Sequence, residues 1–304
     1  CLRNAGIPHP ETYRVQESLL QYEDRIFKPS DTSGARGISF LKSTASHVES
    51  NAAFEFAKQN CRAGVPIVQR YIPGRRQISI EGCVVDRRFH LFAMADRHYD
   101  RVETPMLEDG HTTPADLTSA MQSEIESQFI RALRAVGIDY GPVKGDIIVW
   151  EDGTIWILEV AARTSGGRFI SGTVPLAYGY EPLEAIIKLA VGDAVGSRDF
   201  NKTAISVASQ RYFWAKRAGK ISDINLSALT LEQQVEKAIE IVLPTIGDVA
   251  RPAECHGDRL GWVITSHVNR SDAINAAIFV RDSYRISISK SNHSEDNKDS
   301  DQNR

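Results

Sequence analysis

The chain has 304 residues, enough for two domains or for one large domain with an appended module. Its 36 basic and 39 acidic residues nearly balance, which argues against a protein that binds nucleic acid or a membrane surface through net charge. The sequence has no apolar run long enough to span a bilayer and no signal peptide.

The four cysteines are widely scattered and form no CxxC pair. Free thiols in a reducing cytosol are the simplest interpretation, so a cytoplasmic protein is expected. These residues are Cys1, Cys61, Cys83 and Cys255.

Both ends of the chain are unusual. The chain opens with Cys1 instead of Met, and its first residues are typical of a helix end followed by a turn, so we expect residues 1–24 to be the remnant of an N-terminal region. Residues 291–304 are polar and charged without large apolar side chains, and we expect them to be disordered.

In chain order, strand-like and helix-like segments alternate without a short repeat. Alternating apolar residues predict strands, and apolar residues at helical spacing predict helices. After about residue 201 the segments become shorter, and a boundary is expected near Gly196, in a stretch rich in turn residues. The predicted elements are strands at 25–29 and 66–72, a hairpin at 76–97 that turns at 85–87, helices at 47–60, 116–136 and 181–191, a hairpin at 145–160, short strands at 204–214 and 261–268, and short helices near 231–239 and 271–280.

The hairpin at 145–160 carries two acids inside apolar strands. Asp152-Gly153 between two apolar runs is a strong signal for a two-residue turn. Counting outward from that turn, Asp146 lies directly opposite Glu159, and because both faces are apolar we expect the hairpin to be central in a sheet. The same count pairs Trp150 with Ile155, Val149 with Trp156, and Ile147 with Leu158.

Two opposed carboxylates in such a place need a cation or a shared proton. Oxygen ligands without nearby His or Cys favour Mg²⁺ or Mn²⁺, and Mg²⁺ usually takes its remaining ligands from nucleotide phosphates and water. Two alternatives stay open: the pairing slips by one residue, or both acids lie at a wet sheet edge. Lys144 is expected to lie off the face of Asp146 and is given no role.

Two further stretches suit nucleotide binding. Lys28 ends a predicted strand and is followed by a small-residue loop with two glycines, so the loop could direct backbone N–H groups and one lysine charge at phosphates. The alternative is an ordinary surface turn. Residues 69–74, a strand end followed by Pro-Gly, could form a hinge that contacts an adenine, or an ordinary strand-to-turn junction.

Taken in this order, the three stretches resemble the ATP-grasp superfamily. Within it, the chain looks most like the carboxylate–amine ligases of the L-amino-acid ligase type, from Gly6 to about Gly192 and more loosely beyond. The stretches are KPSDTSGARGI (28–38), QRYIPGRRQISIEG (69–82) and GDIIVWEDGTIWILEVAARTSGG (145–167).

The resemblance implies an α+β fold in which two α/β lobes grip ATP, followed by a small C-terminal α/β domain. The expected parts are a lid subdomain at 25–72, a core with the metal site at 73–196, a C-terminal domain at 197–290, and the tail at 291–304.

The resemblance also implies roles for the nucleotide-binding residues. Lys28 would contact the ATP phosphates, under a loop that closes over them. Asp146 and Glu159 would hold Mg²⁺ (or Mn²⁺) against those phosphates. The loop residues are Ser33, Gly34 and Gly37, and the hinge residues that hold the adenine are Gln69, Tyr71 and Ile72.

On the substrate side, the resemblance implies that Arg163 binds the acyl-phosphate or the substrate carboxylate, next to Gly166 and Gly167. A structural ion pair is the alternative for Arg163. In the resembled ligases the corresponding region lies near the acceptor pocket, so the resemblance implies that His111 contacts the substrate; a solvated loop histidine is the alternative. Arg163 and Lys28 are therefore the expected catalytic residues.

The chain departs from the usual pattern at Ala161, where an Asn that ligates a second ion is common, and at Gln69, where a Glu is common. The first departure puts the second metal ion in doubt.

The activity implied is an ATP-dependent ligase that joins a carboxylate to an amine through an acyl-phosphate. Its partners would be those two small molecules, with no nucleic acid or membrane, and a homodimer is left open. The alternatives are a carboxylase of the purine-biosynthesis type, which uses bicarbonate, and a nucleotide-binding module without turnover.

Overall fold

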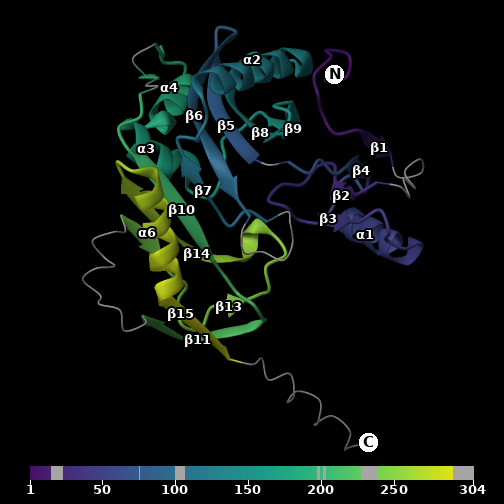
Figure 1. The fold of residues 1–304 in the computed structure, drawn as a ribbon, viewed down its shortest axis with the longest axis vertical. Helices are drawn as coiled ribbons and strands as arrows, with labels where there is room; N and C mark the ends of the chain where they lie inside the picture. The colour runs from purple at the N-terminus through teal and green to yellow at the C-terminus, as the bar shows by residue number, and fades with distance from the viewer. Residues whose placement is uncertain are drawn as a thin grey trace, which may run out of the picture.

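Three antiparallel sheets organise the described part of the chain in the computed structural model (Figure 1). A large central sheet has a smaller sheet and helix beside it, and a third sheet follows below it near the C-terminus. The structure describes residues 1–14, 23–74, 76–99, 107–196, 199–200, 203–226 and 239–289.

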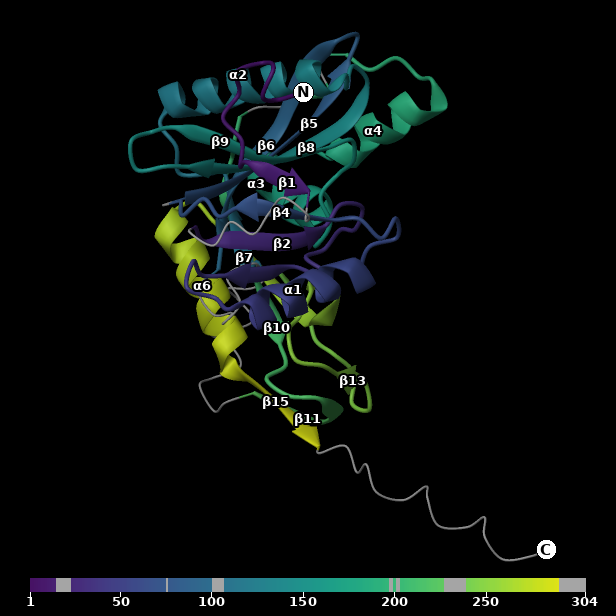
Figure 2. The same ribbon diagram turned by 90° about the vertical axis from the view of Figure 1, so that its right-hand side faces the viewer.

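The smaller sheet has four strands and α1 lies next to them (Figure 2); we call this sheet and helix the lid. Helix α1 (His47–Gln59) begins with a capping box, in which Ser46 and Glu49 satisfy each other's backbone N–H groups. Phe27 and Val68 pack against the alanines of α1 to make the lid core. In sheet order the strands are β1 (Thr12–Arg14), β4 (Pro66–Arg70), β2 (Arg25–Pro29) and β3 (Ser39–Leu41).

The central sheet has eight strands and takes them from both sides of Gly196. The expected boundary at that residue, like the other expected domain limits, therefore stays a prediction. In sheet order the strands are β12 (Glu240–Val242), β14 (Arg259–His267), β10 (Val207–Trp214), β7 (Gly110–Thr113), β6 (Arg88–His98), β5 (Arg76–Val85), β8 (Gly141–Val149) and β9 (Ile155–Ala161).

Helix α2 (Ser119–Val136) covers one face of this sheet, where Phe129 packs with Ile78, Ile80 and Ile147 in the main core. Gly145 faces the same helix so closely that a Cβ there would lie 2.4 Å from the Phe129 ring. Because side chains alternate along a strand, the neighbours of these residues, Asp146 among them, point to the opposite face. That face carries the candidate site.

The remaining elements flank the central sheet. A π-helix (Phe169–Thr173) leads into α3 (Val174–Tyr178) and α4 (Pro182–Val191), which pack in a second core with Phe92. Helix α6 (Arg270–Ser283) packs on β10 and β14. The third sheet has the order β13 (Val249–Ala250), β11 (Gly219–Leu226) and β15 (Tyr284–Ser289).

Most predicted elements are observed within a few residues of their expected bounds. The hairpin at 76–97 turns at Asp86-Arg87, both with positive φ. The helix expected near 231–239 lies almost wholly outside the described residues, which omit 227–238. The tail expected at 291–304 lies outside them as well. In the described part of the chain, no helix is both long enough and apolar enough to cross a membrane.

Candidate active site

The carboxylate pair comes from the hairpin of β8 and β9. Asp146 pairs directly with Glu159, which confirms the predicted register at the acids. The prediction is wrong nearer the turn, where Val149 pairs with Ile155, because the loop is one residue longer than expected. Leu158 is an extra residue in β9, a β-bulge that restores the register at the acids.

The loop of this hairpin has three residues, not two. The Trp150 N–H donates to the Thr154 carbonyl at 2.9 Å, and the Gly153 N–H donates to the Trp150 carbonyl at 3.1 Å. Gly153 has a φ of 86°, the left-handed conformation that ends such a loop. The predicted pairs of Trp150 with Ile155 and of Ile147 with Leu158 are therefore wrong as well.

The hairpin is not central in the sheet. Among the described strands, β9 is the last of the eight, so one edge faces outward. The N-terminal segment covers part of this edge, since the Ile157 N–H donates to the Pro8 carbonyl at 2.9 Å. Glu159, whose side chain is 45% exposed, is accordingly accessible from outside the sheet, whereas Asp146 is nearly buried.

Three cations surround the carboxylate pair. The Lys144 Nζ lies 2.9 Å from Asp146 Oδ2 and 3.9 Å from Glu159 Oε1, so it bridges the pair. Arg97 Nη1 lies 3.2 Å from Asp146 Oδ1, and Arg163 Nη2 lies 3.5 Å from Glu159 Oε1. Burial alone would raise the pKa of Asp146, but Arg97 and Lys144 outweigh it and lower that pKa to about 2.

The prediction that Lys144 lies off this face is wrong, because residues two apart in a strand share a face. Lys144 pairs across the strands with Ala161 on one side and with Glu81 on the other. Its side chain therefore extends over the small Ala161 and between the two carboxylates. Both Lys144 and Arg97 were missed. The two-residue spacing of Lys144 from Asp146 was readable from the sequence, whereas Arg97 comes from another strand, β6.

Lys28 lies on β2 of the lid. Burial lowers the pKa of Lys28, and the charges of Glu159 and Asp146 act in the opposite direction. These two carboxylates are the charged groups of the other lobe that act on it. The lid lysine thus lies within electrostatic range of the carboxylate pair, and its role at the site stays a prediction.

The loop after β2 has a left-handed backbone at three positions. Gly34, Ala35 and Gly37 all have positive φ, with values of 76°, 61° and 70°. A Cβ on Gly37 would lie 2.5 Å from the Asn60 Cβ, so no side chain fits there. Ser33 at the start of this turn is exposed, which leaves its hydroxyl accessible.

The three expected hinge residues lie at the end of β4. Gln69 donates to Thr12 Oγ1 at 2.8 Å and so joins β4 to β1. Tyr71 packs edge-on against Phe40, and Ile72 is buried. Gly74 follows, where a Cβ would lie 1.9 Å from Ile148 Cγ2, so the chain passes close to β8 as it leaves the lid.

The loop after β9 joins Arg163 to Gly166 and Gly167. The buried Glu81 Oε1 accepts the Ser165 N–H at 2.7 Å and fixes this loop to β5. A Cβ on Gly167 would lie 2.6 Å from Tyr212 Oη, which donates to the Gly167 carbonyl at 3.1 Å. Gly166 has open space around it.

A buried charge network extends from Asp146 into the C-terminal part of the chain. Arg97 bridges Asp146 and Glu108, with Glu108 Oε1 3.4 Å from Arg97 Nε. Glu108 Oε2 also accepts from Arg259 Nη2 at 3.2 Å, and the Arg259 guanidinium lies 3.6 Å above the Tyr212 ring. Burial would raise the pKa of Glu108, but Arg97, the contact with His111 and then Arg259 hold it well below its usual range.

His111 is not a solvated loop residue. It is 3% exposed in β7, its Nε2 lies 2.9 Å from Thr173 Oγ1, and its ring packs edge-on against Phe169. Its Nδ1 is 3.6 Å from Glu108 Oε1, so it borders the charge network. Burial lowers the pKa of His111, with Glu108 acting in the opposite direction.

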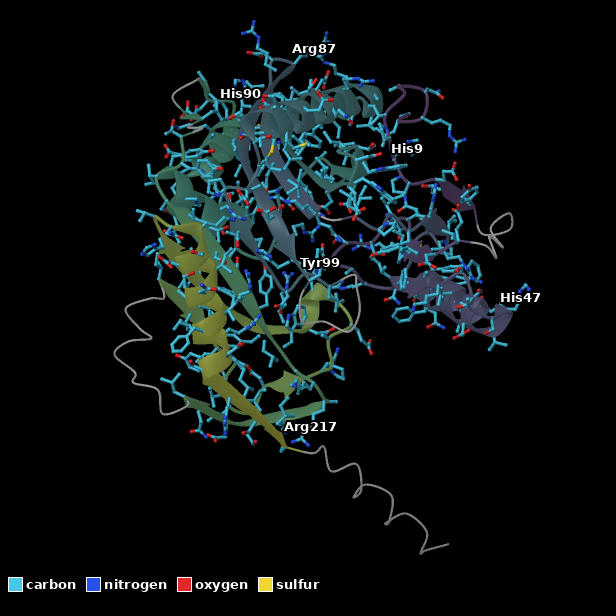
Figure 3. All side chains as sticks on the ribbon, viewed as in Figure 1. His9, His47, Arg87, His90, Tyr99 and Arg217 are labelled. Atoms are coloured by element: carbon cyan, nitrogen blue, oxygen red, sulfur yellow. The ribbon has the colours of Figure 1, made fainter. Side chains whose placement is uncertain are left out.

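Figure 3 shows Tyr99, whose ring centre lies 5.6 Å from the Arg97 guanidinium, near the middle of the molecule beside the lid.

The carboxylate pair fits one divalent cation. A cationic ammonium group already lies between the two carboxylates, which shows that the pair accommodates positive charge. Within the described ranges, no group of three or more His, Cys, Asp or Glu side chains could hold a metal by itself. Two carboxylates that share an ion with substrate phosphates are the usual protein contribution to a Mg²⁺ site.

A lid sheet and a central sheet that meet at a lysine and a carboxylate pair define the ATP-grasp class of fold. A family model of the ATP-grasp domain matches residues 1–167. The chain belongs to this family. No curated protein matches the chain.

Solved structures share the fold at low sequence identity. The L-amino acid ligase from Bacillus licheniformis has a TM-score of 0.76 and 18% identity, and the match covers 95% of this chain and 70% of that chain. Phosphoribosylglycinamide synthetase from Anaerococcus prevotii has a TM-score of 0.64 and 16% identity, over 95% and 72%. The biotin carboxylase domain of 2-oxoglutarate carboxylase from Hydrogenobacter thermophilus has a TM-score of 0.70 and 15% identity, over 95% and 65%.

Proposed function

We propose that the protein is an ATP-dependent ligase that joins a carboxylate to an amine through an acyl-phosphate. The observation that carries the proposal is the convergence of an opposed acid pair, Asp146 and Glu159, with a lid lysine and with Arg163. Phosphoryl transfer needs little from a protein beyond positioning and charge neutralisation, and these groups supply both.

The residues divide into a nucleotide side and a substrate side. Asp146 and Glu159 would hold Mg²⁺, which when bound neutralises charge on the ATP phosphates. Lys28 adds a fixed positive charge from the lid, and the loop at 33–37 offers backbone N–H groups to the phosphate oxygens. The hinge at 69–72 would contact the adenine.

Arg163 is the residue proposed to hold the reacting carboxylate and the acyl-phosphate made from it. Its guanidinium can bind either group with two parallel hydrogen bonds. The substrate carboxylate oxygen attacks the γ-phosphorus of ATP, and the bond from that phosphorus to the bridging oxygen breaks to release ADP. The amine nitrogen then attacks the acyl carbon, inorganic phosphate leaves, and the amine loses its extra protons to solvent.

The contact of Arg163 with Glu159 in this structure is compatible with that role. Both side chains are almost half exposed, and an exposed ion pair of this kind contributes about 0–1 kcal/mol. Arg163 can therefore exchange Glu159 for a substrate anion at little cost. Gly166 has open space around it, and His111 is buried in β7.

The fold is shared with ligases and carboxylases, so the reaction type is the point to test. The wild-type protein should be screened for ADP release with Mg·ATP and pairs of amino acids. We expect ADP to form in a one-to-one ratio with a new amide, and only when both an acid and an amine are present. ADP release with bicarbonate alone would indicate a carboxylase, and nucleotide binding without any ADP would indicate a module without turnover.

The cellular location and the partners of the protein stay predictions. The four cysteines are free in the structure, in keeping with the expected reducing cytoplasm. The expected partners are the two small-molecule substrates, and a homodimer is left open.

A further inference from the structure

A short turn from the C-terminal part of the chain contacts the loop after β2. The turn is a 3-10 helix at His256–Asp258, directly before β14. In Figure 1 it is the yellow-green coil beside the lid strands. The His256 N–H donates to the Gly34 carbonyl at 2.9 Å, at the tip of the glycine-containing loop.

Two further contacts make this loop a bridge between the lid and the C-terminal part. Arg36 Nη2 lies 3.7 Å from where a Cβ on Gly257 would be, so the loop contacts the turn at a second residue. At the other end, the Asp31 carboxylate accepts the Arg62 N–H at 3.0 Å and the Ala63 N–H at 2.6 Å, beyond α1. The loop is thus held at its base by the lid and at its tip by the turn.

The turn itself is held by Asp258. Its Oδ2 accepts the Glu254 N–H at 3.0 Å and the Cys255 N–H at 2.9 Å. These bonds fix the direction of the next N–H group, that of His256. The contact to Gly34 is therefore a consequence of the turn's own geometry.

The His256 side chain lies against the loop after β2, since its Cβ is 3.8 Å from where a Cβ on Gly34 would be. Its Nε2 is buried, and it has no hydrogen-bond partner among the described residues. Burial, and then the charge of Arg259, lower the pKa of His256 to about 3, while Glu108 and Asp146 act in the opposite direction. The groups that act on the ring are thus those of the charge network, and the neutral ring can donate one hydrogen bond to an oxygen that arrives there.

We propose that the turn Cys255–Asp258 is part of the nucleotide site: its backbone holds the tip of the phosphate loop, and His256 Nε2 bonds a phosphate oxygen that the loop encloses. A buried nitrogen without a partner is costly, and a phosphate oxygen is the partner that the surrounding arginines would bring there. The inference rests on the proposed function, because it takes the loop at 33–37 as the phosphate loop.

The ring is tested by the equilibrium affinity for Mg²⁺ with a non-hydrolysable ATP analogue. His256→Ala should weaken binding roughly 10- to 100-fold, since it removes a hydrogen bond to a charged group. His256→Gln, which keeps a donor, should recover part of that loss. His47→Ala is the matched control, because His47 lies on α1 at the far side of the lid (Figure 3) and should leave the affinity unchanged.

The contact between the turn and Gly34 is tested by the rate at which trypsin cleaves after Arg36. Cleavage is followed by mass spectrometry in the absence of nucleotide. His256→Ala keeps the backbone N–H that bonds Gly34, so its cleavage rate should match that of the wild type. Asp258→Ala releases the two N–H groups that fix the turn, so cleavage should become at least several-fold faster. Asp193→Ala, an exposed aspartate away from the loop, should cleave like the wild type.

The outcomes separate the two proposals. This inference alone is overturned if His256→Ala binds the ATP analogue within twofold of the wild type. It is also overturned if Asp258→Ala leaves the rate of cleavage after Arg36 unchanged. A wild-type protein that binds no ATP analogue at all overturns the proposed function, and the role given to the His256 ring falls with it.

Discussion

Glu81 is a carboxyl group with no solvent exposure in β5, and its Oε2 has no hydrogen-bond partner among the described residues. Burial raises the pKa of Glu81 to about 7, against the opposing effects of the Ser165 bond, Lys144 and Arg163. The group therefore keeps its proton in the folded state over a pH range where the unfolded chain has lost it. Glu81 also fixes the loop that carries Arg163, so its protonation state belongs to the chemistry of the site.

The first prediction follows from this raised pKa. The contribution of Glu81 to stability is complete below about pH 4.5 and is lost as the pH rises through about 7. At about 1.4 kcal/mol for each pH unit between 4.5 and about 7, the loss is roughly 3 kcal/mol. Glu81→Gln removes this titration. The variant should therefore become more stable relative to the wild type as the pH rises. Urea unfolding across this range measures it, with the exposed Glu55→Gln as control; parallel curves for Glu81→Gln and the wild type would be the contrary result.

Lys144 is the second residue with a separable effect, because it bridges Asp146 and Glu159. Lys144→Met leaves the buried Asp146 with fewer partners and should lower the free energy of unfolding by about 1–3 kcal/mol. Millimolar Mg²⁺ should restore most of that loss, since a divalent ion can replace the ammonium group. Thermal unfolding with and without Mg²⁺ is the measurement, with the exposed Lys220→Met as control. A Mg²⁺ effect no larger than in the wild type would speak against a metal position between these carboxylates.

At the residue scale, the sequence predicted the acids better than the cations. Asp146 and Glu159 could be paired from one turn signal and the two-residue period of a strand. Arg97 and Glu108 are separated from them by whole strands, and nothing local indicates which strands become neighbours. Lys144 was predictable from its two-residue spacing to Asp146, and it was missed by a wrong assignment of its face.

At the scale of elements, the β8–β9 hairpin places the acids through two irregularities that cancel. The three-residue loop shifts the pairing by one position, and the bulge at Leu158 shifts it back before Asp146 is reached. Local signals predicted the existence of this hairpin and most other elements. They did not predict the loop length, because Asp-Gly suits a two-residue turn and also the end of a three-residue turn.

The hairpin gives a third prediction. Gly153 has a φ of 86° with open space around it, so an added side chain meets backbone strain and nothing else. Gly153→Ala should therefore destabilise the protein by about 1 kcal/mol. Gly196→Ala, in open space and without a positive φ, should be neutral or slightly stabilising. Thermal unfolding of both variants checks the pair, and equal effects would show that the loop at 151–153 is not held as described.

At the scale of the whole molecule, the candidate site is assembled from segments far apart in sequence. The lid supplies Lys28, the hairpin supplies the acids, and β14 supplies Arg259, which reaches Glu108 beneath the Gly167 loop. The ATP-grasp fold could be anticipated because three stretches appear in the order of that superfamily. The part played by the C-terminal segment could not, because its polar residues show no motif until the sheet brings β10 beside β7 and β14 beside β10.

The most direct test of the account is the Mg²⁺-dependent affinity of the protein for a non-hydrolysable ATP analogue, measured for Asp146→Asn and Glu159→Gln. Each variant removes one charge from the proposed metal site while preserving shape, and Glu151→Gln, an exposed residue in the loop of the same hairpin, is the control. We expect affinity to fall about tenfold or more in both site variants, as ligand loss at a metal site typically gives, and to be unchanged in the control. Wild-type affinity in Asp146→Asn and Glu159→Gln would contradict the assignment of this carboxylate pair to Mg·ATP.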